Sequence, residues 1–340
     1  MISPSFLIKR AKDTDIKNWV ATAKRLQGEI HRPWPILFAD MINCTMKYGA
    51  GYVDYDTLKM YNMNAKQRAN VLTIAKNNAL VRELNDREKR DIFRNKVKFN
   101  QVFADYVKRD WMVIDGNNYE AFEKLAKGRD RLICKPIDQS CGDGIQMLTM
   151  ADEPDLRAAY NRMWEKKAVL VEEVIVQDEE MNKLCSTAVN TVRMVTIRNG
   201  EDVTLLMAAV RMGREGNFVD NLNFGGYGAK KGGLAAVLDP ATGKVILPAF
   251  DKNRVRYDEI PVLGTKIMGF QIPRWDECLE FVKGAAKVVP EVRFVGWDVC
   301  ISKDRGLLLI EGNEFPGNDL QVPDRDIGTY GAVMRALGRA

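Results

Sequence analysis

The sequence holds a single histidine, His31, among its 340 residues. A Ser-His-Asp or Cys-His mechanism would have to run through that one side chain, and no nucleophile motif lies near it in the chain. A metal site built from several histidines is excluded outright. We therefore expect His31 to have a structural or surface role.

Paired cysteines are also missing. The six cysteines show no CxxC spacing, and several of them lie in apolar runs. They are Cys44, Cys134, Cys141, Cys185, Cys278 and Cys300. This pattern disfavours a disulfide framework and a zinc ribbon. We expect buried free thiols in a reducing compartment.

Long apolar runs and clustered charge are absent as well. No stretch approaches the roughly 18 to 20 apolar residues that a membrane span needs. The first residues, MISPSFLIKRAKDTD, lack the apolar core and the cleavage site of a secretory signal. The net charge of +5 is spread along the chain, which suits anionic small molecules better than nucleic acid. We expect a cytoplasmic protein with no transmembrane segment.

What the sequence does contain is an ordinary globular composition, with 46% hydrophobic and 29% charged residues. Its length allows about two domains. Apolar residues at three- and four-residue spacing predict helices up to about residue 108, over 15–30, 34–49 and 64–85 among others. Asn64 and Gln67 predict a capping box at the start of the third.

From residue 111 onward the pattern changes to alternating strands and helices, which predicts an α+β or α/β unit. Strands are expected at 111–116, 131–137, 144–150 and 168–176, with a helix over 153–167 that Asp152 opens. Two hairpins follow, over 191–213 with its turn at Asn199-Gly200 and over 235–250. A helix over 273–290 precedes a final hairpin.

Oxygen-bearing side chains gather in that final hairpin. The apolar run at 307–310 predicts a buried strand, and it ends in Glu311, Gly312 and Asn313. Residues i and i+2 of a strand share a face, so Glu311 and Asn313 would present their oxygens side by side. Asp298 lies in the preceding strand, FVGWDVCI, and could join them. Three hard oxygen groups at one strand end suit magnesium.

A turn rich in glycine follows the strand that carries Lys135. Ser140, Gly142 and Gly144 form it, and glycines let backbone amides approach phosphate oxygens while a lysine adds a point charge. There is no GK[ST] sequence and no helix directly after it, so this is not a P-loop. A plain hairpin turn explains the same residues.

Charged residues also interrupt other apolar strands. Glu172 and Glu173 end one of them, either as surface charge or as part of a hinge that contacts a nucleotide. Arg193 and Arg211 lie on two later strands, where a buried arginine needs a partner. A structural ion pair and a phosphate or oxyanion contact are both open for each arginine.

The order of these elements resembles the ATP-grasp superfamily: a lysine-glycine turn, an acidic hinge, strand arginines, an Asn-Gly-Gly loop and a D-x12-E-x-N ending. Residues from about 95 to 318 look like the nucleotide-binding halves of D-alanine–D-alanine ligase and of the ribosomal-protein glutamate ligases. The chain is most similar to the sugar-transfer-associated ATP-grasp family, which is related to alpha-L-glutamate ligases. The stretches GYVDYDTLKMY, NTVRMVTI, FVDNLNFGGYGA, GFQIPRWDE and VGWDV carry that similarity.

The resemblance implies an α+β ATP-grasp fold, in which two α+β subdomains sandwich ATP, preceded by an N-terminal helical region. We predict a helical region over 1–92, a small lid subdomain over 93–174 and a C-terminal subdomain with the metal site over 175–340. Ligases of the superfamily usually have an α/β domain where this chain has helices. Their substrate sites therefore cannot be transferred to it.

The resemblance also assigns roles to individual residues. The phosphate-binding residues are Lys96 (with Lys98 as a competitor), Lys135, Ser140, Gly142 and Gly144. The residues around adenine and ribose are Glu172, Glu173, Ile175 and Glu179 or Glu180. The magnesium ligands are Asp298, Glu311 and Asn313. The catalytic residues near the γ-phosphate and the acyl group are Arg193 and Arg211. The substrate-binding candidates Asn221, Asn223, Gly225 and Gly226 come instead from the loop VDNLNFGGYGAKKGG, which has little reason to be ordered unless it contacts something.

The activity that the resemblance implies is an ATP- and magnesium-dependent ligase, with ATP and two Mg²⁺ ions. It would activate a carboxylate as an acyl phosphate and join it to an amine or another nucleophile. The link to glycan assembly suggests an amino acid joined to a sugar or sugar nucleotide in surface polysaccharide biosynthesis. A kinase acting on a hydroxyl group and a nucleotide-binding scaffold in a glycan-synthesis complex are the alternatives. For the oligomeric state, a homodimer is one open alternative.

Overall fold

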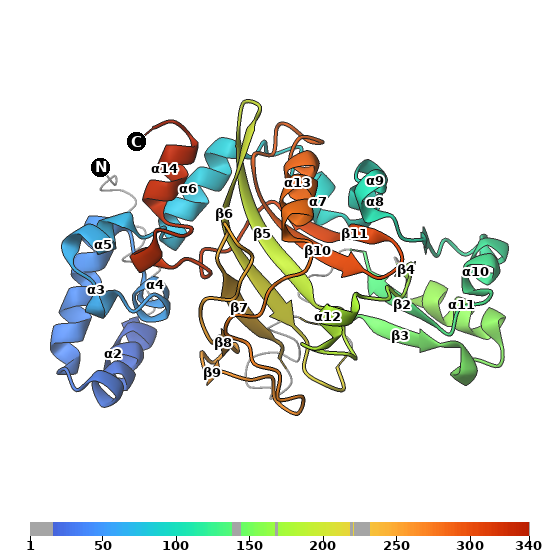
Figure 1. The fold of residues 1–340 in the computed structure, drawn as a ribbon, viewed down its shortest axis with the longest axis horizontal. Coiled ribbons are helices and arrows are strands. Elements are labelled where there is room, and N and C mark those ends of the chain that lie inside the picture. Colours follow the sequence, from blue (N-terminus) through green and yellow to red (C-terminus); the bar gives the residue numbers. More distant parts are fainter. Residues whose placement is uncertain (1–15, 138–143, 167–168, 218–219, 221–231, 340) are drawn as a thin grey trace. The chain divides into compact units, whose positions relative to one another are not determined.

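The structure is a computed structural model that describes residues 16–137, 144–166, 169–217, 220 and 232–339. The chain divides into two units (Figure 1). The first consists of the described residues up to Leu84 together with those from Gly317 onward, and the second is Asn85–Pro316. Each unit has hydrophobic core residues of its own.

The first unit is helical, as the sequence predicts. Its elements are α2 (Ile16–Ile30), α3 (Trp34–Tyr48), α4 (Tyr52–Thr57), η1 (Met60–Asn62), α5 (Ala65–Asn70), α6 (Ile74–Leu84), η3 (Pro323–Arg325) and α14 (Tyr330–Ala336). Trp19 and Tyr55 lie in its core. Gly49 ends α3 in the left-handed conformation, with φ of 72°. Asn64 and Gln67 form the predicted capping box at the start of α5.

The single helix predicted over 64–85 is wrong, because the chain breaks between α5 and α6. Val71 and Leu72 lie in the break and are fully buried. Polar side chains satisfy the backbone groups that the break frees. Gln321 accepts from the amide of Leu72 at 3.0 Å, Asp54 accepts from the first amide of α6 at 3.0 Å, and Lys76 donates to the carbonyl of Val71 at 2.7 Å. Burial of two apolar side chains outweighs a continuous helix here.

Asp40 of α3 is at the centre of a polar cluster in this unit. Arg68 donates to both of its carboxylate oxygens at 2.7 Å, and the hydroxyl of Tyr55 donates to one of them at 2.7 Å. Burial acts to raise the pKa of Asp40, but the hydrogen bonds from Arg68 and Tyr55 together outweigh it and hold the pKa below its ordinary value. The cluster therefore stabilises the ionised carboxylate.

We expect Asp40→Asn to lower the free energy of unfolding by about 2 kcal/mol near neutral pH, since charge-assisted hydrogen bonds contribute this much. Because the folded pKa of Asp40 lies below its unfolded value near 3.8, the stabilisation is fully present above that value and is lost as the pH falls through the folded pKa. Urea unfolding of both proteins across this range measures the difference. It should be constant down to about pH 4.5 and shrink below it; a difference that widens in acid would contradict the assignment.

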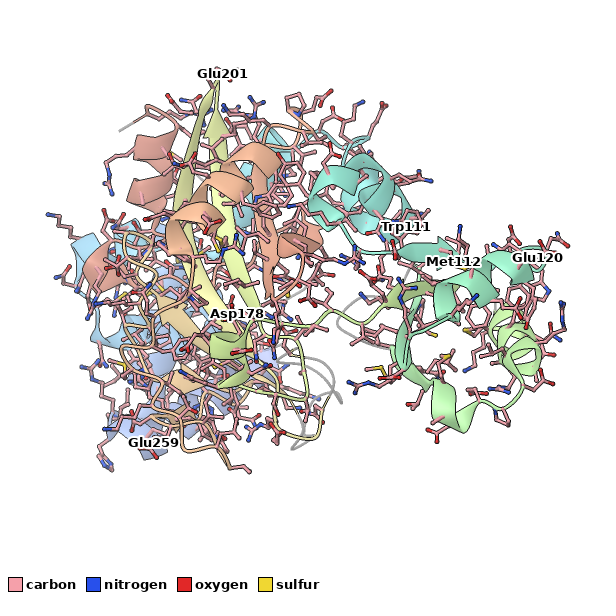
Figure 2. The ribbon with its side chains drawn as sticks, turned by 45° about the vertical axis from the view of Figure 1, so that its right-hand side comes forward. Trp111, Met112, Glu120, Asp178, Glu201 and Glu259 are labelled. Carbon is pink, nitrogen blue, oxygen red and sulfur yellow. The ribbon has the colours of Figure 1, made fainter. Side chains whose placement is uncertain are left out.

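The second unit is built on a seven-stranded antiparallel sheet in the order β11-β10-β5-β6-β7-β8-β9. The strands are β5 (Thr191–Asn199), β6 (Asp202–Met212), β7 (Leu234–Leu238), β8 (Ala249–Phe250), β9 (Arg256–Tyr257), β10 (Phe294–Ser302) and β11 (Gly306–Asn313). The predicted hairpins β5–β6, β7–β8 and β10–β11 are confirmed. The turn of the first lies at Gly200 and Glu201, one residue later than predicted, because Asn199 still pairs with Asp202. Figure 2 labels Glu201 at the tip of the first.

Helices cover one face of this large sheet (Figure 1). They are α7 (Asp91–Arg94), α8 (Lys96–Val102), α9 (Ala104–Val107) and α13 (Trp275–Ala285). Side chains from α7 to α9 and from α13 share one apolar core with alternate residues of β5, β6 and β10, including Met194 and Trp297. The residues between them in sequence therefore face the other side of the sheet.

A second, four-stranded antiparallel sheet has the order β1-β4-β2-β3. Its strands are β1 (Trp111–Val113), β2 (Arg131–Pro136), β3 (Gln146–Thr149) and β4 (Val169–Glu173), and its helices are α10 (Tyr119–Ala126), η2 (Met150–Asp152) and α11 (Leu156–Glu165). In Figure 2, Trp111 marks where the chain passes into this small sheet. The prediction that Asp152 opens α11 is wrong: Asp155 caps it, accepting from two amides of its first turn, while Asp152 lies in η2.

The described cysteines are buried free thiols and the histidine lies at the surface, in agreement with the sequence analysis. Within the described residues, the free and buried cysteines are Cys44, Cys134, Cys185, Cys278 and Cys300. Burial raises the pKa of the Cys134 thiol to about 12, so that it is not a reactive thiolate. His31 is exposed just beyond α2. None of the described helices has the length and apolar character needed to cross a bilayer.

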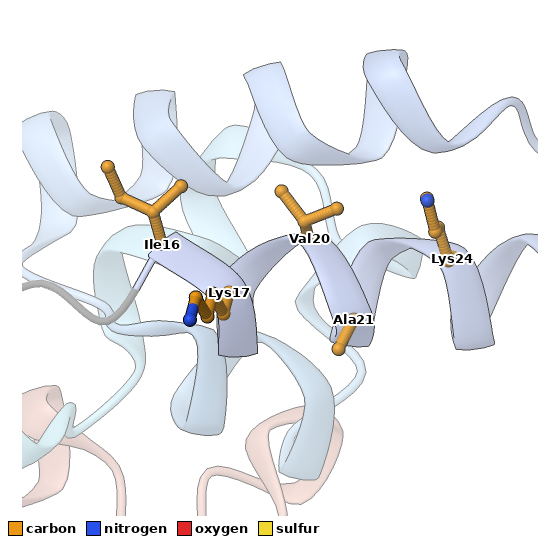
Figure 3. Close-up of a pocket in the computed structure, with 5 residues that line it drawn as sticks. All are labelled: Ile16, Lys17, Val20, Ala21 and Lys24. Atoms are coloured by element: carbon orange, nitrogen blue, oxygen red, sulfur yellow. The ribbon is translucent and has the colours of Figure 1, made fainter.

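A shallow hollow of about 420 Å³ lies on α2 in the first unit (Figure 3). Its lining residues are Ile16, Lys17, Val20, Ala21 and Lys24. None of the residues predicted for nucleotide, metal or substrate binding is among them.

Candidate active site

The final hairpin brings the three predicted magnesium ligands together on one face of the large sheet. Asp298 of β10 lies opposite Glu311 of β11 and, on its other side, opposite Arg193 of β5. Residues directly opposite in an antiparallel pair share a face. The amide nitrogen of Asn313 lies 3.3 Å from a carboxylate oxygen of Glu311. The D-x12-E-x-N spacing thus corresponds to one compact cluster.

The glycine between Glu311 and Asn313 is required by the opposite face of β11. A Cβ atom at Gly312 would lie 2.8 Å from the ring of Phe99 and 2.9 Å from that of Phe93. These rings belong to an aromatic cluster that also includes Trp297. The strand can therefore present a carboxylate and an amide on one face only if the residue between them has no side chain.

Two arginines hold Asp298. Arg193 donates to its two oxygens at 2.5 and 2.9 Å, and Arg211 donates to the second of these oxygens at 2.9 Å. The side chain of Asp298 is only 2% exposed. Burial acts to raise the pKa of Asp298, but the two guanidinium groups together outweigh it and lower the pKa to about 2. Each strand arginine thus has an ion-pair partner.

The pKa of Glu311 is shifted in the opposite direction from that of Asp298. Removal from solvent and then the neighbouring charge of Asp298 raise the pKa of Glu311, although Arg193 and Arg211 oppose the shift. The carboxylates of Asp298 and Glu311 lie side by side, so their like charges repel each other. A cation between them would relieve that repulsion.

Asp220 extends the cluster and was not predicted. Its carboxylate accepts from the amide of Thr191 at 3.1 Å and from the hydroxyl of Thr191 at 2.5 Å, and it lies 3.6 Å from Arg211. Burial raises the pKa of Asp220, although Arg211 opposes the shift. An acidic residue directly before Asn221, at the start of the glycine- and asparagine-rich loop, is the signal that would have found it.

The donor set of this face fits a magnesium ion. Asp298, Glu311 and Asn313 offer carboxylate and amide oxygens, which are the ligands that Mg²⁺ takes. With Asp220, three carboxylates face two guanidinium groups, so the ionised cluster carries a net negative charge. Within the described residues, no three or more His, Cys, Asp and Glu side chains are grouped to hold a metal. A magnesium ion at this face would therefore be held by Asp298 and Glu311 together with the amide oxygen of Asn313.

Lys135 and Glu172 form a second cluster on the small sheet. Lys135 lies 2.5 Å from one oxygen of Glu172, while the other accepts from Arg109 at 2.9 Å and from Asn100 at 3.1 Å. Burial acts to raise the pKa of Glu172, but Arg109 and Lys135 outweigh it and hold the pKa below its ordinary value. Nothing in the sequence around Arg109, VKRDW, distinguishes it from a surface arginine, so only the structure reveals this partner.

The two candidates for the first phosphate lysine, Lys96 and Lys98, have different surroundings. Lys96 begins α8, and its amino group lies 3.0 Å from the carbonyl of Pro136, at the end of the strand that carries Lys135. Lys98 pairs instead with Asp91 and is 54% exposed. The two predicted lysines, Lys96 and Lys135, therefore belong to adjoining elements.

The other predicted nucleotide contacts are placed differently. Glu173, the last residue of β4, forms an ion pair with Arg305 at 2.8 Å. Ile175 is half-buried just beyond β4. Glu179 begins α12 (Glu179–Asn182), is 76% exposed and forms an ion pair with Lys303 at 2.8 Å. It is not part of either buried cluster.

Of the predicted glycine-rich turn, Gly144 has φ of 72°, a conformation that favours glycine. The remaining predicted residues of the two loops lie outside the described residues. They are Ser140, Gly142, Asn221, Asn223, Gly225 and Gly226.

A large antiparallel sheet with an acidic and amide cluster, next to a small sheet with the lysine, defines an ATP-grasp fold. The model of the sugar-transfer associated ATP-grasp family matches residues 75–327, well over half of the chain. The chain belongs to this family.

Several solved structures match the chain at low identity. They include D-alanine–D-alanine ligase from Helicobacter pylori, with 14% identity, 67% of this chain and 56% of that chain covered, and a TM-score of 0.40. The ATP-grasp ligase PsnB complexed with minimal precursor is 15% identical, with 75% of this chain and 62% of that chain covered and a TM-score of 0.43. N5-carboxyaminoimidazole synthetase from Staphylococcus aureus complexed with ADP is 12% identical, with 67% of this chain and 46% of that chain covered and a TM-score of 0.41. The chain spans less than two thirds of each, and a comparison with curated proteins found no match.

Proposed function

We propose that this chain is an ATP- and magnesium-dependent ligase that activates a carboxylate as an acyl phosphate and joins it to an amine or another nucleophile. The observation that carries the proposal is the convergence of Asp298, Glu311 and Asn313 beside Arg193 and Arg211, in a chain of the ATP-grasp family. Such a face supplies metal ligands and fixed positive charge next to each other, as phosphoryl transfer requires.

The reaction proposed has two steps. A carboxylate oxygen of the first substrate attacks the γ-phosphorus of ATP, the bond from that phosphorus to the β-γ bridging oxygen breaks, and ADP leaves. The nitrogen of the second substrate then attacks the acyl carbon, the bond from that carbon to the phosphate oxygen breaks, and the amine loses a proton to the released phosphate. The chain need supply little acid-base chemistry of its own, which agrees with its single histidine.

Each cluster has a role in this proposal. Lys96 and Lys135 bind phosphate oxygens, with Glu172 and Ile175 on the adenine side. Mg²⁺, when bound by the cluster at the end of the final hairpin, supplies Lewis-acid neutralisation of phosphate charge. Arg211 orients the acyl group and stabilises the oxyanion that forms at its carbon. Two ions are proposed, and residues 93–174 and 175–340 are proposed as the two subdomains around ATP.

The substrates proposed are small molecules, a carboxylate such as an amino acid and an acceptor that carries a sugar. The family description, sugar-transfer associated, supports the second part. We place the activity in the cytoplasm, where ATP and such precursors meet, and in the synthesis of surface polysaccharide.

Hydroxylamine trapping tests the proposal. With ATP, Mg²⁺ and a panel of carboxylates, we expect hydroxylamine to intercept the acyl phosphate and give a hydroxamate, measured by its iron complex alongside phosphate release. ATP turnover without hydroxamate, together with a phosphorylated hydroxyl product, would instead identify a kinase. Nucleotide binding without turnover on any carboxylate, amine or alcohol would support a scaffold.

A further inference from the structure

We propose that Arg109 is a positioning residue that fixes the lysine-bearing small sheet against the strand that carries Glu311 and Asn313. The inference rests on the function proposed above. Arg109 lies between α9 and β1, just before Trp111, where the chain passes into the small sheet (Figure 2). Its side chain is only 2% exposed, so its contacts are made within the protein.

The first set of contacts is with the edge strand β11. Arg109 donates to the carbonyls of Leu309 and Ile310, at 2.5 and 3.2 Å. Asp298 pairs with Glu311 while Val299 pairs with Leu309, so that Ile310 is the extra residue of a β-bulge. A bulge redirects the side chains that follow it. By binding both carbonyls of the bulge, Arg109 fixes the direction in which Glu311 leaves the strand.

The second set of contacts is with the small sheet. Arg109 donates to Glu172 at 2.9 Å, and the other oxygen of Glu172 lies 2.5 Å from Lys135. Asn100 of α8 donates to Glu172 and accepts from Arg109 at 3.3 Å. Because α8 begins at Lys96, one guanidinium group connects the elements that carry both predicted phosphate lysines and the metal ligands.

Only an arginine can make these contacts together. Its planar fork presents several donors in fixed directions, whereas a lysine offers one point charge on a flexible stem. A displacement of about 1 Å between positioned groups can cost as much as 10²-fold in rate. A small sheet that tilts relative to β11 would therefore separate the proposed phosphate lysines from the proposed metal ligands, although Arg109 is itself neither of these.

The test measures binding of a non-hydrolysable β,γ-imido analogue of ATP by calorimetry, at several Mg²⁺ concentrations, below the unfolding temperature of every variant. We expect Arg109→Met to weaken analogue binding by about 10- to 100-fold and to raise the Mg²⁺ concentration needed, as loss of an outer contact to a metal site does. Arg109→Lys should be more stable than Arg109→Met but should still bind the analogue more weakly than the wild type does. Arg198→Met is the matched control. Like Arg109, Arg198 donates to backbone carbonyls, including that of Gly200, but it lies at the end of β5 away from Arg193.

The outcomes separate the two proposals. Arg198→Met should lower the unfolding temperature and bind the analogue as the wild type does. If Arg109→Met is less stable but keeps wild-type affinity and Mg²⁺ dependence, Arg109 is merely structural and this inference is overturned while the proposed function stands. If the wild type itself does not bind the analogue with Mg²⁺, the proposed function is overturned and this inference with it.

Discussion

Glu311→Gln is expected to abolish most turnover while leaving the fold at least as stable as before. The change removes one of two carboxylate ligands from the proposed magnesium site, and losses of about 10²- to 10³-fold in kcat are typical when one stabilising group is removed from such a site. Stability should not fall, because the pKa of Glu311 is raised by its removal from solvent and by the charge of Asp298. The amide removes that like-charge repulsion from the metal-free protein.

Phosphate release and urea unfolding, each with and without Mg²⁺, measure the two effects. Mg²⁺ should stabilise the wild type and have little effect on Glu311→Gln. The folded pKa of Glu311 is raised, so the stability that it contributes is fully present below its unfolded pKa, near 4.5, and is lost as the pH rises through the folded value. Glu311→Gln should not show this loss of stability with rising pH, because glutamine does not ionise. Near-normal turnover by Glu311→Gln would remove Glu311 from the metal site.

Asp298→Asn should have the opposite effect on stability, although the two residues are opposite each other in register. Asp298 is the shared acceptor of Arg193 and Arg211, and it is 2% exposed. Removing one member of a buried ion pair leaves the other charge without compensation and typically costs about 3 to 5 kcal/mol. We therefore expect both a loss of turnover and a marked loss of stability.

Urea unfolding of the metal-free protein is the measurement that separates these variants. Glu311→Gln should match or exceed the wild type, and Asp298→Asn should fall well below it. The contribution of Asp298 is present above its unfolded pKa, near 3.8, and is lost as the pH falls through its folded pKa of about 2. An Asp298→Asn variant as stable as the wild type would show that the two arginines do not depend on this carboxylate.

The two carboxylates of the motif D-x12-E-x-N have different surroundings. The sequence predicts both as magnesium ligands. Asp298 lies in β10, between Glu311 of β11 and Arg193 of β5, whereas Glu311 lies on the edge strand. One carboxylate is therefore held ionised by two arginines, whereas burial and the charge of its neighbour raise the pKa of the other. We expect Glu311 to respond most directly to the metal.

Features that depend on neighbouring residues in the chain could be predicted from the sequence. The capping box of Asn64 and Gln67 and, to within one residue, the turn at Gly200 depend only on local backbone geometry. The same holds for the shared face of Glu311 and Asn313, because side chains alternate along any strand. Local patterns failed where burial intervened, as at Val71 and Leu72, whose burial breaks a helix that periodicity alone would continue.

The sequence by itself determined the family, the order of the elements and the residues at the end of the final hairpin. Only the tertiary structure decided that Arg193 and Arg211 share Asp298, and that Arg109 connects the bulge of β11 to Glu172. The physical reason is that an ion pair depends on which strands become neighbours and on how much solvent they exclude. Neither property is present in a stretch of sequence until the sheets have formed.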